Sequence, residues 1–147
     1  TLIDHPSMSV RVLITDCPPS EQLLRDEYVP VFEEQRVAVL IRLCEPTYDT
    51  SVVENAGVKV VDSMAFTDGS SPPPETLAEY RRLLDALAST NTDSRATVAV
   101  HCVSGIGRAP LFALIPLVDA GMEVTEAVEY IRQRRRGAFN KVQLAWI

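Results

Sequence analysis

The stretch that decides how this chain folds reads His101-Cys102-Val103-Ser104-Gly105-Ile106-Gly107-Arg108. The residues before it, 96–100, are apolar or β-branched and predict a buried strand. Pro110 follows shortly and opens an apolar run. That position suits the first turn of a helix, because the first amides of a helix have no intrahelical partner to lose. The stretch is therefore predicted to be a tight loop between a strand and a helix.

A loop of this composition can bind an anion. Gly105 and Gly107 let the backbone curl, so that the N–H groups from Val103 to Arg108 converge on one point. The start of the following helix adds partial positive charge, and the planar guanidinium of Arg108 suits a phosphate bidentately. Cys102 lies where this field favours the thiolate over the thiol. The sequence thus predicts a nucleophile facing a bound phosphate.

Cys-x5-Arg with a preceding histidine resembles the signature of the cysteine-dependent protein tyrosine phosphatases. The longer string from His101 to Pro110 resembles one branch, the phosphatases of regenerating liver (protein tyrosine phosphatase type IVA), as do residues 42–50 and 131–140. The resemblance implies a phosphatase that forms a cysteinyl phosphate on Cys102. The residues alone also allow an inert buried cysteine in a glycine turn.

Strand-like and helix-like segments alternate along the chain. Strands are expected at 2–3, 10–15, 37–43, 58–61 and 96–100, and helices at 21–35, 50–56, 75–89, 110–120 and 124–135. Pro30 and Pro116 fall inside expected helices and should break or kink them. The alternation predicts a three-layer α/β fold with a mostly parallel central sheet of about four or five strands and helices on both faces. The dual-specificity phosphatases are similar in architecture.

Length and composition limit the possibilities. The 147 residues, 46% of them hydrophobic, are expected to form one domain, 1–147, trimmed at both ends because the chain starts at Thr1. The net charge of −6 argues against a nucleic-acid partner. Three cysteines, an odd number, favour a reducing, cytoplasmic location. The cysteine and histidine spacing predicts no metal site, and no cofactor is expected.

The carboxyl ends of parallel strands meet at one edge of a sheet, where ligands bind. The loops that carry Cys44, Asp68 and Cys102 should therefore converge on one cleft.

A general acid is needed for the leaving oxygen. In the type IVA branch it lies in a Phe-Asp-Asp-Gly segment, which Phe66-Thr67-Asp68-Gly69 resembles, so the resemblance implies that Asp68 is the acid. The tryptophan-proline that precedes this segment in the branch is missing. From the residues alone, Asp68 could instead begin an Asp-Gly turn. Asp62 and Asp49 are weaker candidates, and Asp49 also suits a helix cap.

Further residues take roles from the resemblance. Ala109 stands where most cysteine phosphatases have a hydroxyl residue, which implies slow hydrolysis of the phosphocysteine, although alanine is also simply a good helix former. Cys44 matches the branch's partner cysteine and implies a reversible disulfide with Cys102. Its alternative role is that of a small apolar residue at a strand end. His101 is expected to brace the loop rather than act as a base, and Cys17 is expected to be structural.

The predicted substrate is a phosphoprotein or a phosphoinositide. The alternative is a binding module, because the branch engages the cytoplasmic domain of magnesium transporters through a partner aspartate, and a carboxylate can mimic phosphate. Arg132, Arg134, Arg135 and Arg136 predict either a solvated helix face or a rim for anionic lipid. Branch members end in a prenylated cysteine motif, which the printed C-terminus does not contain, so prenylation is considered only for a longer protein.

Overall fold

The computed structural model describes residues 1–66, 71–90, 95–103, 107–139 and 141–147. The described strands form one sheet in the order β1-β2-β5-β3-β4. Their bounds are β1 Leu2–Ile3, β2 Arg11–Thr15, β3 Val37–Arg42, β4 Lys59–Val61 and β5 Thr97–His101. Only the pairing of β1 with β2 is antiparallel among these strands, and the other neighbours run parallel. The mostly parallel sheet is thus confirmed.

The two parallel strands that differ most in burial are β5 and β4. Every residue of β5 is buried, as expected for a strand with neighbours on both sides and helices on both faces. In β4, by contrast, Lys59 is exposed and Val60 and Val61 are half-buried. The strand expected at 58–61 is therefore present but only partly buried, because β4 lies at the end of the strand order.

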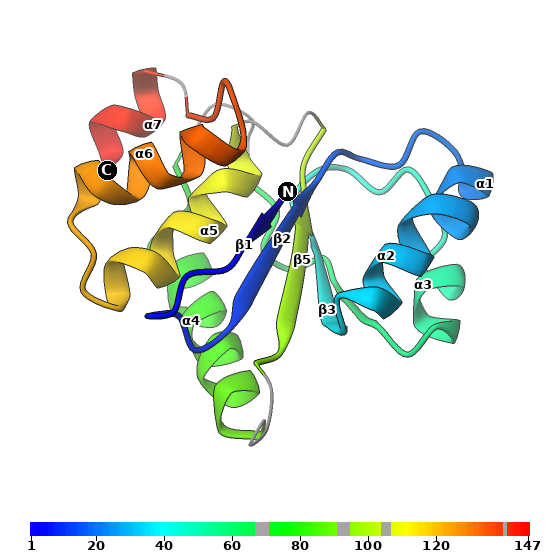
Figure 1. The fold of residues 1–147 in the computed structure, drawn as a ribbon. Helices are drawn as coiled ribbons and strands as arrows, with labels where there is room; N and C mark the ends of the chain where they lie inside the picture. Colours follow the sequence, from blue (N-terminus) through cyan, green and yellow to red (C-terminus); the bar gives the residue numbers. More distant parts are fainter. Residues whose placement is uncertain (67–70, 91–94, 104–106, 140) are drawn as a thin grey trace.

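Helices cover both faces of the sheet (Figure 1). On one face lie α1 Glu21–Leu23, the π-helical turn η1 Leu24–Tyr28, α2 Val29–Glu34 and α3 Ser51–Asn55. On the other lie α4 Pro74–Thr90, α5 Arg108–Asp119, α6 Val124–Arg134 and α7 Lys141–Trp146. Each face has its own cluster of buried apolar side chains, a smaller one around Phe32 and Leu40 and a larger one around Phe112 and Ile131. The three predicted layers are therefore present.

The first helical region changes its hydrogen-bonding pattern just before Pro30. Ser20 caps α1 by accepting a hydrogen bond from the Leu23 N–H at 3.1 Å. The chain then widens into η1 and returns to α-helix at Val29, so that Pro30 lies in the first turn of α2, where its missing N–H costs nothing. Pro116 behaves differently, since α5 continues past it to Asp119.

Two glycines lie just beyond the ends of helices. Gly57 follows α3 with φ +88°, and Gly121 follows α5 with φ +107°, a region that side chains with a Cβ rarely adopt.

The helix α5 is the most buried helix next to the sheet. Its first eight residues, 108–115, are all buried, and α6 packs on it with Ala127, Val128 and Ile131 buried. Within the described part of the chain, each helix falls short of the length and hydropathy that a membrane span needs. The chain thus brings the N-terminus of a long buried helix to the end of its central strand.

Candidate active site

Three cysteine-bearing loops leave the sheet side by side. Cys17 follows β2, Cys102 follows β5 and Cys44 follows β3, and β5 lies between the other two strands. The register aligns the last residues of β2 and β3 with His101, the last residue of β5. Each cysteine therefore stands one or two residues beyond the same row, at the carboxyl edge where the sequence placed the cleft.

The predicted phosphate loop begins at Cys102, whose side chain is buried. Val103 is exposed, and its carbonyl accepts a hydrogen bond from the Cys17 N–H at 3.2 Å. Residues 104–106 lie outside the described part of the chain. Gly107 stands at the N-cap of α5. The described ends of this loop are thus a strand end and a helix start, as its sequence predicted.

Arg108 is anchored to two neighbouring loops. Its guanidinium is buried, and Nη1 donates to the carbonyl of Leu43 at 2.8 Å and to that of Phe66 at 3.0 Å. Leu43 directly follows β3, and Phe66 lies in the loop after β4. The arginine therefore ties the loops of Cys44 and Asp68 to the start of α5.

Asp68, the predicted general acid, lies outside the described residues. Phe66 is the last described residue before Asp68, and its ring stacks on the ring of Phe112 with centroids 6.2 Å apart. The rival Asp62 accepts two hydrogen bonds from Arg42, both at 2.6 Å, and this pairing lowers the pKa of Asp62. A carboxylate held ionised in this way has no proton to give near neutral pH.

Asp49, the other rival, has a structural partner. Its Oδ1 accepts the Ser51 N–H at 2.8 Å at the start of α3, and this bond lowers the pKa of the exposed Asp49 carboxyl. The residue thus caps the short helix, as the sequence allowed.

A series of polar contacts links Arg42, Tyr48 and His101 to the carbonyl of Cys102, where the phosphate loop begins. Arg42, besides its pairing with Asp62, donates to the Tyr48 carbonyl at 2.8 Å and lies over the Tyr48 ring, 4.8 Å from its centroid. The Tyr48 hydroxyl lies 2.5 Å from Nε2 of His101, and Nδ1 of that ring lies 3.2 Å from the Cys102 carbonyl. Because a carbonyl only accepts, Nδ1 carries the proton and Nε2 accepts from Tyr48.

Burial lowers the pKa of His101 to about 4, mainly by penalising the charged ring. The ring is therefore neutral near pH 7. Its contacts are those of a residue that braces a loop.

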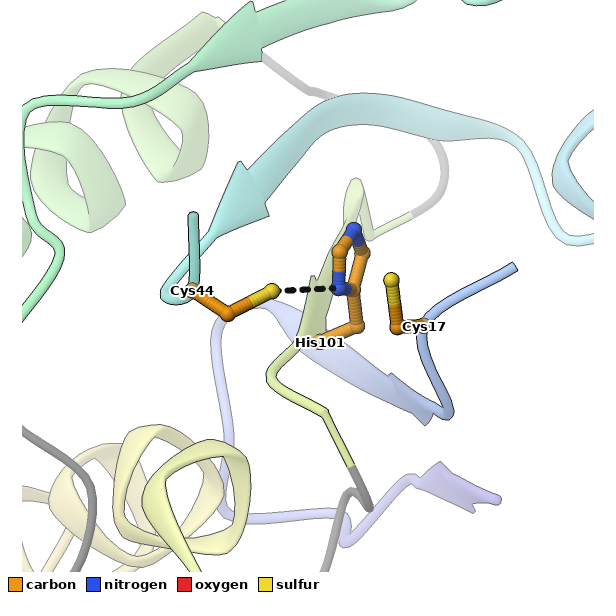
Figure 2. A group of neighbouring side chains, drawn as sticks. All are labelled: Cys17, Cys44 and His101. Atoms are coloured by element: carbon orange, nitrogen blue, oxygen red, sulfur yellow. Dashed lines mark hydrogen bonds between the residues drawn. The ribbon is translucent and has the colours of Figure 1, made fainter. Parts of the chain in front are cut away.

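Cys44 and Cys17 lie on either side of the His101 ring (Figure 2). Cys44 Sγ is 3.8 Å from Nδ1 of His101, and the two sulfurs and a ring nitrogen all lie within 4.8 Å of one another. All three cysteines lie outside disulfides in this structure. Burial raises the pKa of the Cys44 thiol to about 11. Sequence reasoning missed this cluster, because its members come from three separate strand ends and show no ligand spacing.

Three of the four arginines of residues 132–136 make described contacts within the protein. Arg132 donates to two carbonyls of the loop after α6, and Arg134 lies over the ring of Tyr130, 3.5 Å from its centroid. Arg135 forms an ion pair with Asp16 at 2.5 Å. The last arginine of the segment is exposed. Much of this positive charge thus serves the fold.

Comparisons with known proteins agree with this geometry. The sequence model of the protein-tyrosine phosphatase family matches residues 33–145. PRL-1 phosphatase of Drosophila melanogaster is 38% identical over 146 residues, covering 99% of this chain and 79% of that protein. Protein tyrosine phosphatase type IVA 3 of Homo sapiens is 36% identical over 138 residues, covering 94% and 77%.

Solved structures of phosphatases are similar to this chain as well. A Leishmania major protein described as a protein tyrosine phosphatase superimposes with a TM-score of 0.86 at 34% identity, over 99% of this chain and 94% of that one. Human DUSP28, at 14% identity and a TM-score of 0.67, covers 99% and 91% and shares the fold.

Proposed function

This chain belongs to the protein-tyrosine phosphatase family, in its type IVA branch, and is thus a protein-tyrosine phosphatase; we propose that it works through a slowly hydrolysed cysteinyl phosphate on Cys102. The observation that carries the proposal is the position of Cys102 between β5 and α5, with the buried Arg108 anchored to both flanking loops.

The reaction has two displacements. Backbone N–H groups from Val103 to Arg108 and the Arg108 guanidinium hold the substrate phosphate. The Cys102 thiolate attacks phosphorus in line, so that an S–P bond forms while the ester P–O bond breaks, and Asp68 gives its proton to the leaving oxygen. Water then attacks phosphorus, the S–P bond breaks, and inorganic phosphate leaves.

The described residues support these roles in two ways. Arg108 has a fixed position, which lowers the cost of ordering the phosphate complex. The competing carboxylate of Asp62 is committed to Arg42, which leaves Asp68 as the stronger candidate for the acid. His101, held between Tyr48 and the Cys102 carbonyl, acts as the loop support.

Slow turnover follows from the residue after the arginine. Ala109 is fully buried at the start of α5 and has no hydroxyl to assist the water that cleaves the phosphocysteine. Hydrolysis of the intermediate should therefore limit the rate.

Trapping the intermediate tests the proposal. The protein is mixed with a phosphotyrosine peptide, quenched in acid and weighed by intact-protein mass spectrometry. We expect a species heavier by one phosphoryl group that accumulates in the first turnover and is missing in Cys102→Ser. Product release without any phosphoenzyme in single-turnover samples would contradict the proposal. A phosphoserine peptide and a phosphoinositide, run in parallel, identify the preferred substrate class.

The same pocket supports a second candidate function, binding of a partner's acidic loop. Its donors accept a carboxylate as well as a phosphate, and type IVA resemblance favours the cytoplasmic domain of a magnesium transporter as the partner. Calorimetry with that domain should show binding that Arg108→Ala abolishes. Affinity unchanged in both Arg108→Ala and Cys102→Ser would place the interface elsewhere.

Reversible oxidation is part of the proposal. Hydrogen peroxide converts the Cys102 thiolate to a sulfenic acid, and the Cys44 thiol then attacks that sulfur, releasing water and forming a disulfide. Both residues are buried cysteines outside any disulfide, on neighbouring strand ends. Peptide mapping without reductant after mild peroxide should find the Cys44–Cys102 bridge, in Cys17→Ser as in the wild type. A bridge that contains Cys17 instead would refute this pairing.

The arginines of 132–136 give the protein only a small basic surface for a membrane. Most arginines of 132–136 already make internal contacts, so we expect only slight attraction to anionic lipid in a cytoplasmic setting. Co-sedimentation with phosphatidylserine vesicles should exceed that with neutral vesicles, and Arg136→Glu should remove the difference. Stable anchoring would need a lipidated C-terminus in a longer protein.

A further inference from the structure

The cluster of Cys17, Cys44 and His101 has the composition of a metal site. Two thiols and an imidazole converge from the ends of β2, β3 and β5, with ligand atoms all within 4.8 Å of one another. In a tetrahedral zinc site the sulfur–sulfur distance is about 3.8 Å and the sulfur–nitrogen distance about 3.6 Å, by the usual bond lengths. The Cys44 Sγ to His101 Nδ1 distance is 3.8 Å. One edge of the site therefore already has nearly the required length.

The surroundings can orient the ligands. If the His101 proton moves from Nδ1 to Nε2, Nδ1 offers its lone pair to the metal and Nε2–H donates to the Tyr48 hydroxyl, 2.5 Å away. An oxygen partner on the second ring nitrogen is the usual companion of a metal-bound histidine. The Thr47 hydroxyl lies 3.3 Å from Cys17 Sγ and can donate to a thiolate there. His101 and Cys17 thus each have a neighbouring hydroxyl that can orient them as ligands.

We propose that Cys17, Cys44 and His101 form a binding site for one Zn²⁺ ion per chain. Two thiolates and a neutral imidazole match the preference of this borderline-soft cation, and two thiolate charges offset its charge. Binding releases the thiol protons, and the fourth position is open to water. The half-buried Cys17 gives access from solvent, while Cys44 and His101 are buried.

Metal binding at this site is coupled to the phosphate loop. In the structure, Nδ1 of His101 donates to the carbonyl of Cys102 at 3.2 Å. Once Nδ1 binds the metal, that carbonyl loses its donor, and Cys44 can no longer trap an oxidised Cys102. Zinc should therefore slow the phosphatase and prevent the Cys44–Cys102 disulfide.

Cobalt titration tests the site without relying on activity. Co²⁺ replaces Zn²⁺ in tetrahedral thiolate sites and gives a thiolate-to-cobalt charge-transfer absorption. The reduced protein should show this absorption at one equivalent of Co²⁺, and one equivalent of Zn²⁺ should abolish it. Cys17→Ser and Cys44→Ser should each lose the absorption. Circular dichroism on each variant verifies that it is folded.

The decisive control is Cys102→Ser, which removes the third thiol and the phosphatase activity together. It should keep the full cobalt absorption if the proposal holds, even where the proposed catalytic mechanism fails.

His5→Gln is the matched control for His101→Gln, because it removes the other histidine of the chain. Tyr48→Phe should weaken zinc affinity, measured against a chelator, by about tenfold or more.

Two results overturn the proposal. One is wild-type protein, shown to be fully reduced, that gives no charge-transfer absorption. The other is an absorption that disappears in Cys102→Ser but survives in Cys17→Ser, because the metal is then held by the phosphate loop.

Discussion

The phosphate loop and the Cys17–Cys44–His101 cluster lie at the same edge of the sheet but are built in opposite ways. The loop is one continuous stretch from Cys102 to Arg108 between a strand and a helix. The cluster is assembled from three strand ends that are far apart in the sequence. The two share His101, whose ring contacts both the Cys102 carbonyl and the Cys44 sulfur. In the proposed function, a local motif carries out the chemistry, and side chains from distant parts of the sequence position the motif and, with bound zinc, would slow it.

The largest expected effect separates the nucleophile from the cluster. Cys102→Ser should lower kcat by more than about 10³-fold, since removing a nucleophile abolishes the covalent step. Cys44→Ser, which removes a cluster thiol, should not abolish the phosphoenzyme. Steady-state rates and intact mass on both variants measure this. Comparable losses of kcat in the two variants would mean that the cluster thiol is needed for the covalent step as well.

The next effect concerns the acid. Asp68→Ala should slow turnover of a substrate with a poor leaving group by about 10²-fold or more, because a positioned acid contributes that much, and a good leaving group should lose much less. Asp62→Asn is the matched control. It breaks the ion pair with Arg42 and should lower thermal stability without this dependence on the leaving group. The reverse pattern would assign the acid role to Asp62.

The shared histidine predicts a pH dependence of stability. The pKa of His101 is lowered to about 4 in the folded protein, from 6.5, so between these values the unfolded chain binds more protons. This contribution is complete above about pH 6.5 and is lost as the pH falls toward 4, by about 2 kcal/mol at pH 5. Urea unfolding at several pH values should give a shallower pH slope in His101→Gln than in the wild type. Equal slopes would show that the ring is not buried as described.

The smallest effect tests slow turnover within the loop. Ala109→Ser adds a hydroxyl beside the phosphate site and should raise the steady-state rate about fivefold, the worth of a hydrogen bond of about 1 kcal/mol. The decay of isolated phosphoenzyme should accelerate by the same factor. A variant that turns over more slowly than the wild type would show that hydrolysis is not the limiting step.

The turn at Arg36 is a part of the fold that could not be predicted from the sequence. Arg36 has φ +57°, which a non-glycine residue rarely adopts. The turn is held by contacts from elsewhere, because the Gln35 carbonyl accepts from Arg11 Nη2 and from Thr97 Oγ1, both at 2.7 Å. A conformation fixed by residues far along the chain leaves no local signal in the sequence.

The sequence by itself determined the alternation of strands and helices and the strand–loop–helix unit around Cys102, because periodicity, proline and glycine act within a few residues. The tertiary structure alone decided that Asp62 is bound by Arg42 and that Tyr48 orients His101. It also decided that Cys17, read from the sequence as structural, stands beside Cys44. These contacts depend on the strand order β2-β5-β3, which follows from packing the whole sheet between its helices.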